Sequence, residues 1–180
     1  ISLILVLAML MTMFAGLGTA SASTTTYSCL QVPYVATGTT VSSDKATLGT
    51  IVIDWDTITA SDVYAHKAIL VLPEGFEFVE DSANPGTYSS QVKAVFTKGP
   101  AEYLGKELTT KIISTKEAEI VISGYDKPAT EVRATIQLNG ISVSDSAPTG
   151  EAKARFLNIS GLFPQADVTI GNVVGAGAAS

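Results

Sequence analysis

The sequence contains few of the residues that carry out chemistry. Among 180 residues there are one Cys, one His and one Trp, and only 16% of the residues are Asp, Glu, Lys or Arg. A histidine-based nucleophilic triad could use only His66 as its base, and no D-x-D-x-D-G calcium loop is present. We therefore expect a protein that is not an enzyme, with no catalytic, cofactor-binding or metal-binding residues and no cofactor.

The cysteine content excludes a disulfide framework. Cys29 is the only cysteine, so it cannot form a bridge within the chain. It is either a buried, inert thiol or a residue that pairs with another chain, because free cysteine packs as a small apolar side chain.

Charge is scarce at both ends of the chain. The net charge is −6, from 11 Lys and Arg against 17 Asp and Glu, and this acidic balance argues against nucleic-acid binding. The first charged side chain is Asp44, and after Arg155 only Asp167 remains. Uncharged ends are candidates for burial between subunits. The alternative is that they are a signal with its linker and the last strand of the core.

The first residues form an apolar segment without charge. Residues 1–15 are apolar except for Ser2 and Thr12, Gly16 and Gly18 follow, and Ala20-Ser21-Ala22 matches the small-x-small pattern of a signal-peptidase site. The pattern favours a secretory signal peptide.

The alternative is that this segment is retained as a helix over residues 1–17, which would need neighbours to bury it. In that form it resembles the apolar N-terminus of filament-forming pilins. Position 5 is Leu5, where bacterial pilins carry an acidic residue, so the resemblance is to the archaeal type.

The rest of the chain has the pattern of short strands. Residues 48–55 alternate, with Ile51, Ile53 and Trp55 on one face, and residues 132–138 alternate in the same way. About eight to ten such strands, separated by Gly and Pro turns, predict an all-β fold: an antiparallel β-sandwich of immunoglobulin-like or jelly-roll-like type.

Several segments receive other assignments. We expect an uncharged strand or linker over residues 24–45, the sandwich over 46–174 and a tail over 175–180. Within these, residues 37–45 have loop composition, and residues 57–64 are the only place for a helical turn.

Some side chains come close to forming a site. Trp55 is expected in the core rather than stacked on a ligand. Residues 158–160 fit the glycosylation sequon, which is common by chance. Acidic residues that could supply calcium ligands, but are expected to be solvated, are Asp54, Asp56, Asp62, Glu80 and Asp81.

Two stretches carry a resemblance to a known group of proteins. They are LPEGFEF at residues 72–78, and LNGISV at 138–143 followed by APTGE at 147–151. With these motifs the chain resembles the immunoglobulin-like or cohesin-like modules of secreted Gram-positive surface proteins, which are often found ahead of the stalk domain named after the copper amine oxidase N-terminus. The resemblance implies a structural or adhesive module at the cell surface, and it brings no catalytic residues.

The sequence leads to two functional hypotheses. The first is a structural subunit of an extracellular filament, pilus-like fibre or surface layer, with copies of itself as partner and membrane contact only during export or assembly. The copies would join by exchange of a terminal strand, 25–35 or 168–175, or by packing of the helix 1–17. The second is a monomeric cell-surface module that binds carbohydrate, cell wall or a protein.

Overall fold

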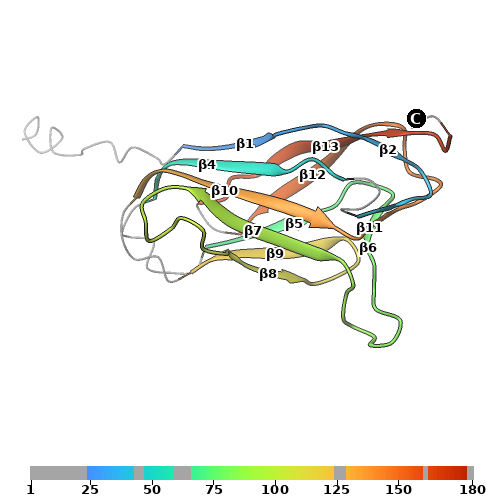
Figure 1. Cartoon of the computed structure of the whole chain (residues 1–180), viewed down its shortest axis with the longest axis horizontal. Coiled ribbons are helices and arrows are strands. Elements are labelled where there is room, and N and C mark those ends of the chain that lie inside the picture. Colours follow the sequence, from blue (N-terminus) through green and yellow to red (C-terminus); the bar gives the residue numbers. More distant parts are fainter. Residues whose placement is uncertain (1–23, 43–46, 59–65, 124–128, 160–161, 178–180) are drawn as a thin grey trace, which may run out of the picture.

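The fold is built entirely from β-strands in a computed structural model that describes residues 24–42, 47–58, 66–123, 129–159 and 162–177. Figure 1 shows the strands running along the long axis of the molecule. In chain order they are β1 (Thr25–Cys29), β2 (Tyr34–Ala36), β3 (Thr40–Val41), β4 (Ile51–Ile58), β5 (His66–Val71), β6 (Phe76–Phe78), β7 (Gln91–Lys98), β8 (Thr109–Ile112), β9 (Glu117–Ile122), β10 (Ala129–Asn139), β11 (Ile141–Val143), β12 (Gly150–Asn158) and β13 (Ala166–Val174).

Two large sheets form the sandwich. The first has four strands in the order β1-β4-β10-β7, and the second has six in the order β2-β13-β12-β5-β9-β8. A small sheet, β3-β11-β6, lies at one end (Figure 1). Neighbouring strands are antiparallel except β2 and β13, which are parallel. The predicted all-β, antiparallel sandwich is confirmed.

The core lies between the two large sheets and follows the predicted alternation. Ile51, Ile53 and Trp55 of β4 are all buried, and the rings of Trp55 and Phe163 meet edge to face with centroids 5.8 Å apart. Tyr27 of the first sheet packs on Phe156 of the second, with ring centroids 4.6 Å apart. Full burial of one such large apolar side chain stabilises the fold by roughly 1.5–3 kcal/mol.

The first residues of the described chain belong to this same core. Val35 of β2 and Val41 of β3 are both completely buried in it. Residues 24–42 are therefore part of the sandwich that residues 47–174 form. The segment 37–45, expected to be a loop, contains the short strand β3, which pairs with β11.

Gly140 separates two strands that belong to different sheets. Gly140 has φ +71°, a conformation that favours glycine. Beyond it the chain leaves the first large sheet and forms β11 in the small sheet. A sequence pattern that looks like one strand with a bulge is thus two strands.

Some sequence predictions concern residues outside the described ranges. These are the N-terminal segment 1–23, Asp62 with most of the expected helical turn, and Ser160 of the sequon. Residues 57 and 58 of that turn belong to β4. No helix within the described ranges has the length and hydropathy that a membrane-spanning helix needs.

Candidate functional site

The chain changes sheets near its start, and this change creates the most unusual surface of the molecule. β1 pairs antiparallel with β4, from Thr25 opposite Trp55 to Cys29 opposite Ile51. Residues 30–33, the crossover segment, then carry the chain to the second sheet, where β2 pairs parallel with β13. β1 and β2 are the outermost strands of their sheets, and we call β1, the crossover segment and β2 together the crossover edge.

Backbone hydrogen bonds hold the crossover segment at both ends. The amide of Leu30 donates to the carbonyl oxygen of Thr50 at 3.0 Å, and the amide of Asn172 donates to that of Pro33 at 2.8 Å. The first bond continues the β1–β4 pairing, and the second begins the contact with β13. The segment therefore joins the two large sheets along one side of the sandwich.

Gly49 makes this close approach of three chain segments possible. Its amide donates to the carbonyl oxygen of Ile170 in β13 at 2.8 Å. A Cβ at this position would overlap the carbonyl oxygen of Gln31 and the Sγ of Cys29. Only a residue without a side chain fits here while the crossover segment keeps its path.

The crossover edge exposes a row of apolar side chains. Leu30, Val32 and Tyr34 are 64%, 40% and 70% exposed, and they alternate along the chain. Residues 24–42 contain no charged side chain. Exposed sheet edges are normally protected by charge, because an uncharged edge with apolar side chains pairs readily with another chain. Pro33 is the only residue of the crossover edge that belongs to a type commonly used to prevent an edge from pairing with another chain.

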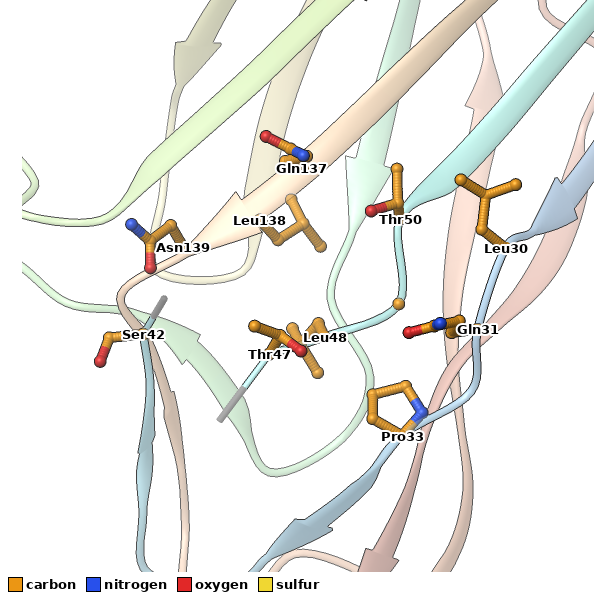
Figure 2. Close-up of a pocket in the computed structure, with 11 residues that line it drawn as sticks. Leu30, Gln31, Pro33, Ser42, Thr47, Leu48, Thr50, Gln137, Leu138 and Asn139 are labelled. Carbon is orange, nitrogen blue, oxygen red and sulfur yellow. The ribbon is translucent and has the colours of Figure 1, made fainter. Parts of the chain in front are cut away.

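A groove of about 390 Å³ opens beside the crossover segment. Figure 2 shows the crossover residues on one side, the end of β10 on the other and the chain before β4 between them. The lining consists of Leu30, Gln31 and Pro33 from the crossover segment, residues 47–50 before β4, residues 137–139 of β10, and Ser42.

Among the described residues, those that line the groove carry no charge and are chemically mixed. Its apolar walls come from Leu30, Pro33, Leu48 and Leu138. Its polar side chains are all amides or hydroxyls: Gln31, Ser42, Thr47, Thr50, Gln137 and Asn139. Such a lining suits a neutral ligand that combines apolar groups with hydrogen-bonding groups.

Two ionisable side chains of β1 point toward the interior. The hydroxyl of Tyr27 is buried without a hydrogen-bond partner, and burial raises its pKa above the ordinary range. The Cys29 thiol donates to the carbonyl oxygen of Gln31 at 2.8 Å. Burial raises the thiol pKa, and the hydrogen bond to Gln31 opposes that shift only in part. The thiol therefore has little nucleophilic thiolate at neutral pH.

The structure places Trp55 in the core, as predicted. Trp55 is 1% exposed, and its Nε1 donates to the carbonyl oxygen of Leu162 at 2.8 Å. Its ring contacts the rings of Phe96 and Phe163. A ligand therefore has no access to the indole face.

The acidic residues considered as calcium ligands have other partners or lie apart. Arg133 donates to both carboxylate oxygens of Asp54, at 2.8 and 3.1 Å. Asp81 accepts hydrogen bonds from the amide of Ala83 and the side chain of Asn84, both at 2.9 Å. In the described part of the chain, no group of three or more His, Cys, Asp or Glu could hold a metal ion.

The groove escaped sequence reasoning. The absence of charge before Asp44 made the start of the chain a candidate for burial between subunits, and the structure shows exposed apolar side chains at Leu30, Val32 and Tyr34 there. The groove depends on how far β10 extends beyond β4, which no local pattern encodes.

The two ends of the sandwich differ in the chain segments they present. β1 begins at one end of the long axis, and β13 ends at the other (Figure 1). Val174 of β13 pairs with Ala36 of β2, and up to roughly 40 Å of extended chain separates Ala36 from Thr24.

Comparison with known proteins gives no more than a loose structural similarity. No protein-family model matches the chain, and no curated protein matches it. Among solved structures, the chain is similar to the pilus backbone protein RrgB of Streptococcus pneumoniae, with a TM-score of 0.40 and 10% sequence identity. The similarity covers 74% of this chain and 31% of the pilus protein, so the chain spans less than a third of that protein. At this level the similarity is between two β-rich proteins, and no function of this chain follows from it.

Proposed function

We propose that the protein is a non-enzymatic structural subunit that assembles with copies of itself into an extracellular filament, pilus-like fibre or surface layer. The observation that carries the proposal is the crossover edge, where Leu30 and Val32 of the crossover segment and Tyr34 of β2 are exposed, within a stretch, residues 24–42, that has no charged side chain. Pairing with another chain would cover these side chains and use the open strand edge.

The position of the chain ends supports an open, head-to-tail arrangement. The strand that begins the sandwich and the strand that ends it reach opposite ends of the long axis (Figure 1). A contact between unlike surfaces at opposite ends repeats head to tail, and it gives an open filament when the rotation between copies does not close a ring.

Exchange of a terminal strand is one route of assembly. β1 would leave β4 of its own chain, and β13 would leave β12, to pair in the next copy. Both are paired within the chain. β1 is the easier to release, since β4 is its only strand neighbour and five residue pairs hold it.

Packing of the helix 1–17 with its copies is the second route. It requires that residues 1–23 are retained. A chain that starts at Thr24 separates the routes: it would still assemble by strand exchange, and it would stay monomeric if the helix is responsible.

An extracellular location follows as part of the proposal. The signal-like pattern of residues 1–23 and the acidic net charge of the protein support export. Contact with the membrane is then expected only during export or assembly. The net charge of −6 gives no attraction for nucleic acid.

The alternative is a monomeric module that binds carbohydrate, cell wall or a protein partner. The groove favours it, because its amide and hydroxyl side chains suit a neutral, hydroxyl-rich ligand. Sedimentation over a hundredfold range of concentration distinguishes the two functions. Reversible growth into oligomers, visible as fibres or layers by electron microscopy, is expected for the subunit. A monomer at every concentration, with affinity for glycans, would contradict the proposal.

A further inference from the structure

The two large sheets separate at one point on the side of the sandwich opposite the crossover edge. β7 and β8 are the outermost strands on that side. The amide of Leu108 donates to the carbonyl oxygen of Ala94 at 2.9 Å and ties the chain before β8 to β7. The Thr110 hydroxyl donates to the carbonyl oxygen of Val92 at 2.7 Å, and β8 then continues beside β9 to Ile112. A pocket of about 430 Å³, the β7–β8 pocket, opens between the diverging strands.

The long connection between β6 and β7 supplies another wall of this pocket. Figure 1 shows the connection extending away from the sheets. It is held together by its own hydrogen bonds: the amide of Asp81 donates to the carbonyl oxygen of Thr87 at 2.8 Å, and the amide of Gly86 donates to the carboxylate of Glu80 at 2.7 Å. The wall is therefore already in shape before a ligand binds, which lowers the entropy cost of binding.

The pocket has an apolar floor and a polar rim. It is lined by residues 86–88 of the connection, residues 90–93, and Thr110 and Ile112 of β8, all within the stretch 66–123 that the structure describes without a gap. Tyr88, Val92 and Ile112 are partly buried and pack on the core. On the rim Gln91 and Lys93 are exposed, and they offer an amide group and an ammonium group for hydrogen bonding.

The charges at the rim favour a neutral ligand. Among the described residues that line the pocket, Lys93 alone is charged, and its Nζ lies 3.4 Å from the carboxylate of Glu107. The pair leaves no net charge to attract an ion. Lys93 also argues against an added peptide strand, because lysine protects an open sheet edge, and the Thr110 hydroxyl already uses the carbonyl oxygen of Val92.

A neutral sugar has the chemistry that fits this lining. The C–H groups on one face of a sugar ring pack on aromatic and aliphatic side chains, and the hydroxyl groups at its edge both donate and accept hydrogen bonds. The Tyr88 ring and Ile112 supply the apolar surface, and Gln91 and Lys93 supply the polar partners. The volume falls within the range of roughly 300–1,000 Å³ that is usual for ligand pockets.

We infer that the β7–β8 pocket binds a neutral oligosaccharide, with one sugar ring on Tyr88 and its hydroxyl groups hydrogen-bonded to Gln91. This inference goes beyond the proposed function. β7 and β8 lie on the side of the sandwich away from β1 and β2, so one copy can use the crossover edge for assembly and the pocket for sugar. The site also differs from the groove, on which the alternative function rests.

Saturation-transfer NMR with the full chain of residues 1–180 tests the binding directly. The probes are neutral trisaccharides of glucose, galactose, mannose and N-acetylglucosamine. We expect saturation transfer to at least one of them at about 10 mM, strongest at the ring protons of one sugar residue, because one ring packs on the floor of the pocket. No transfer to any of the four would overturn the inference.

Substitutions locate the bound sugar. Gln91→Ala and Gln31→Ala each remove an exposed glutamine side chain, the first at the β7–β8 pocket and the second at the groove. We expect Gln91→Ala to weaken the dissociation constant at least about fivefold, as the loss of a hydrogen bond does, and Gln31→Ala to leave it unchanged. Equal effects of the two substitutions, or a larger effect of Gln31→Ala, would place the sugar elsewhere and contradict the inference.

Tyr88→Leu tests the aromatic floor. Leucine keeps an apolar contact with the core and removes the ring, so we expect a folded protein, checked by circular dichroism, with sugar affinity at least about fivefold weaker. A folded variant with native affinity would contradict a sugar ring on Tyr88.

Sedimentation of the same samples separates this inference from the proposed function. If the protein assembles and binds none of the trisaccharides, the inference fails and the proposed function stands. If the protein stays monomeric and binds a trisaccharide at the β7–β8 pocket, the inference stands and the proposed function fails.

Discussion

The amide of Gly49 donates a hydrogen bond to the carbonyl oxygen of Ile170 at 2.8 Å, and this bond ties the start of β4 in one sheet to β13 in the other. The crossover segment passes directly over Gly49. This backbone contact therefore helps to hold the side of the sandwich that carries the exposed apolar row, and it requires that position 49 has no side chain.

Gly49→Ala is expected to destabilise this side of the sandwich. Its methyl group would overlap Gln31 and Cys29, and overpacking of this kind costs about 1–3 kcal/mol of unfolding free energy. Urea denaturation followed by fluorescence measures the change. Gly175→Ala is the control, because nothing lies within 4 Å of a Cβ there. Equal midpoints for the two variants would show that the crossover tolerates a side chain.

The Cys29 thiol reports on whether β1 stays in its sheet. Burial raises the pKa of Cys29, so we expect the thiol of the native protein to react with a thiol reagent at pH 8 more slowly than an unfolded chain, by at least about tenfold. Gly49→Ala should accelerate the reaction, because it displaces the residues that cover the thiol. A native rate equal to the unfolded rate would mean that β1 opens freely.

Trp55→Phe is expected to lower the unfolding free energy by about 1–3 kcal/mol. The change removes the hydrogen bond to the carbonyl oxygen of Leu162 and leaves a small cavity beside Phe163. Circular dichroism must be used for the denaturation curve, because Trp55 is the only tryptophan. An unchanged midpoint would contradict a structural role for the indole group.

Asp81 makes a part of the stability depend on pH. The hydrogen bond from the Asn84 side chain, followed by the one from the Ala83 amide, lowers the pKa of Asp81. The unfolded chain then binds a proton more readily than the folded protein does. The ionised Asp81 side chain therefore stabilises the fold above about pH 4, the ordinary pKa of aspartate, and this stabilisation is lost as the pH falls through the lowered pKa of the folded protein. Denaturation midpoints between pH 6 and 3 should fall less steeply for Asp81→Asn than for the native protein. Ser82→Ala, in the same loop, should keep the native slope.

The fold could be read from the sequence to a large extent, and the site only in part. Alternation of Ile51, Ile53 and Trp55 predicts a core strand because side chains on a strand alternate between the two faces. The sheet to which a strand belongs is a tertiary property, which is why β3, within the segment 37–45, was expected to be a loop. The absence of charge before Asp44 made an interface there a hypothesis, which stays a prediction, while the groove beside it depends on the relative lengths of two strands distant in sequence.

The most direct test is the self-association of Val32→Lys compared with Ile113→Lys. Val32 lies at the centre of the exposed row and Ile113 lies outside the crossover edge; their side chains are similarly exposed, at 40% and 44%. A lysine in this row puts a charge into the apolar surface that the proposal buries between copies, which weakens the contact. Sedimentation equilibrium should give a dissociation constant at least about tenfold weaker for Val32→Lys than for the native protein, and an unchanged constant for Ile113→Lys. Equal association of both variants and the native protein would contradict assembly through the crossover edge.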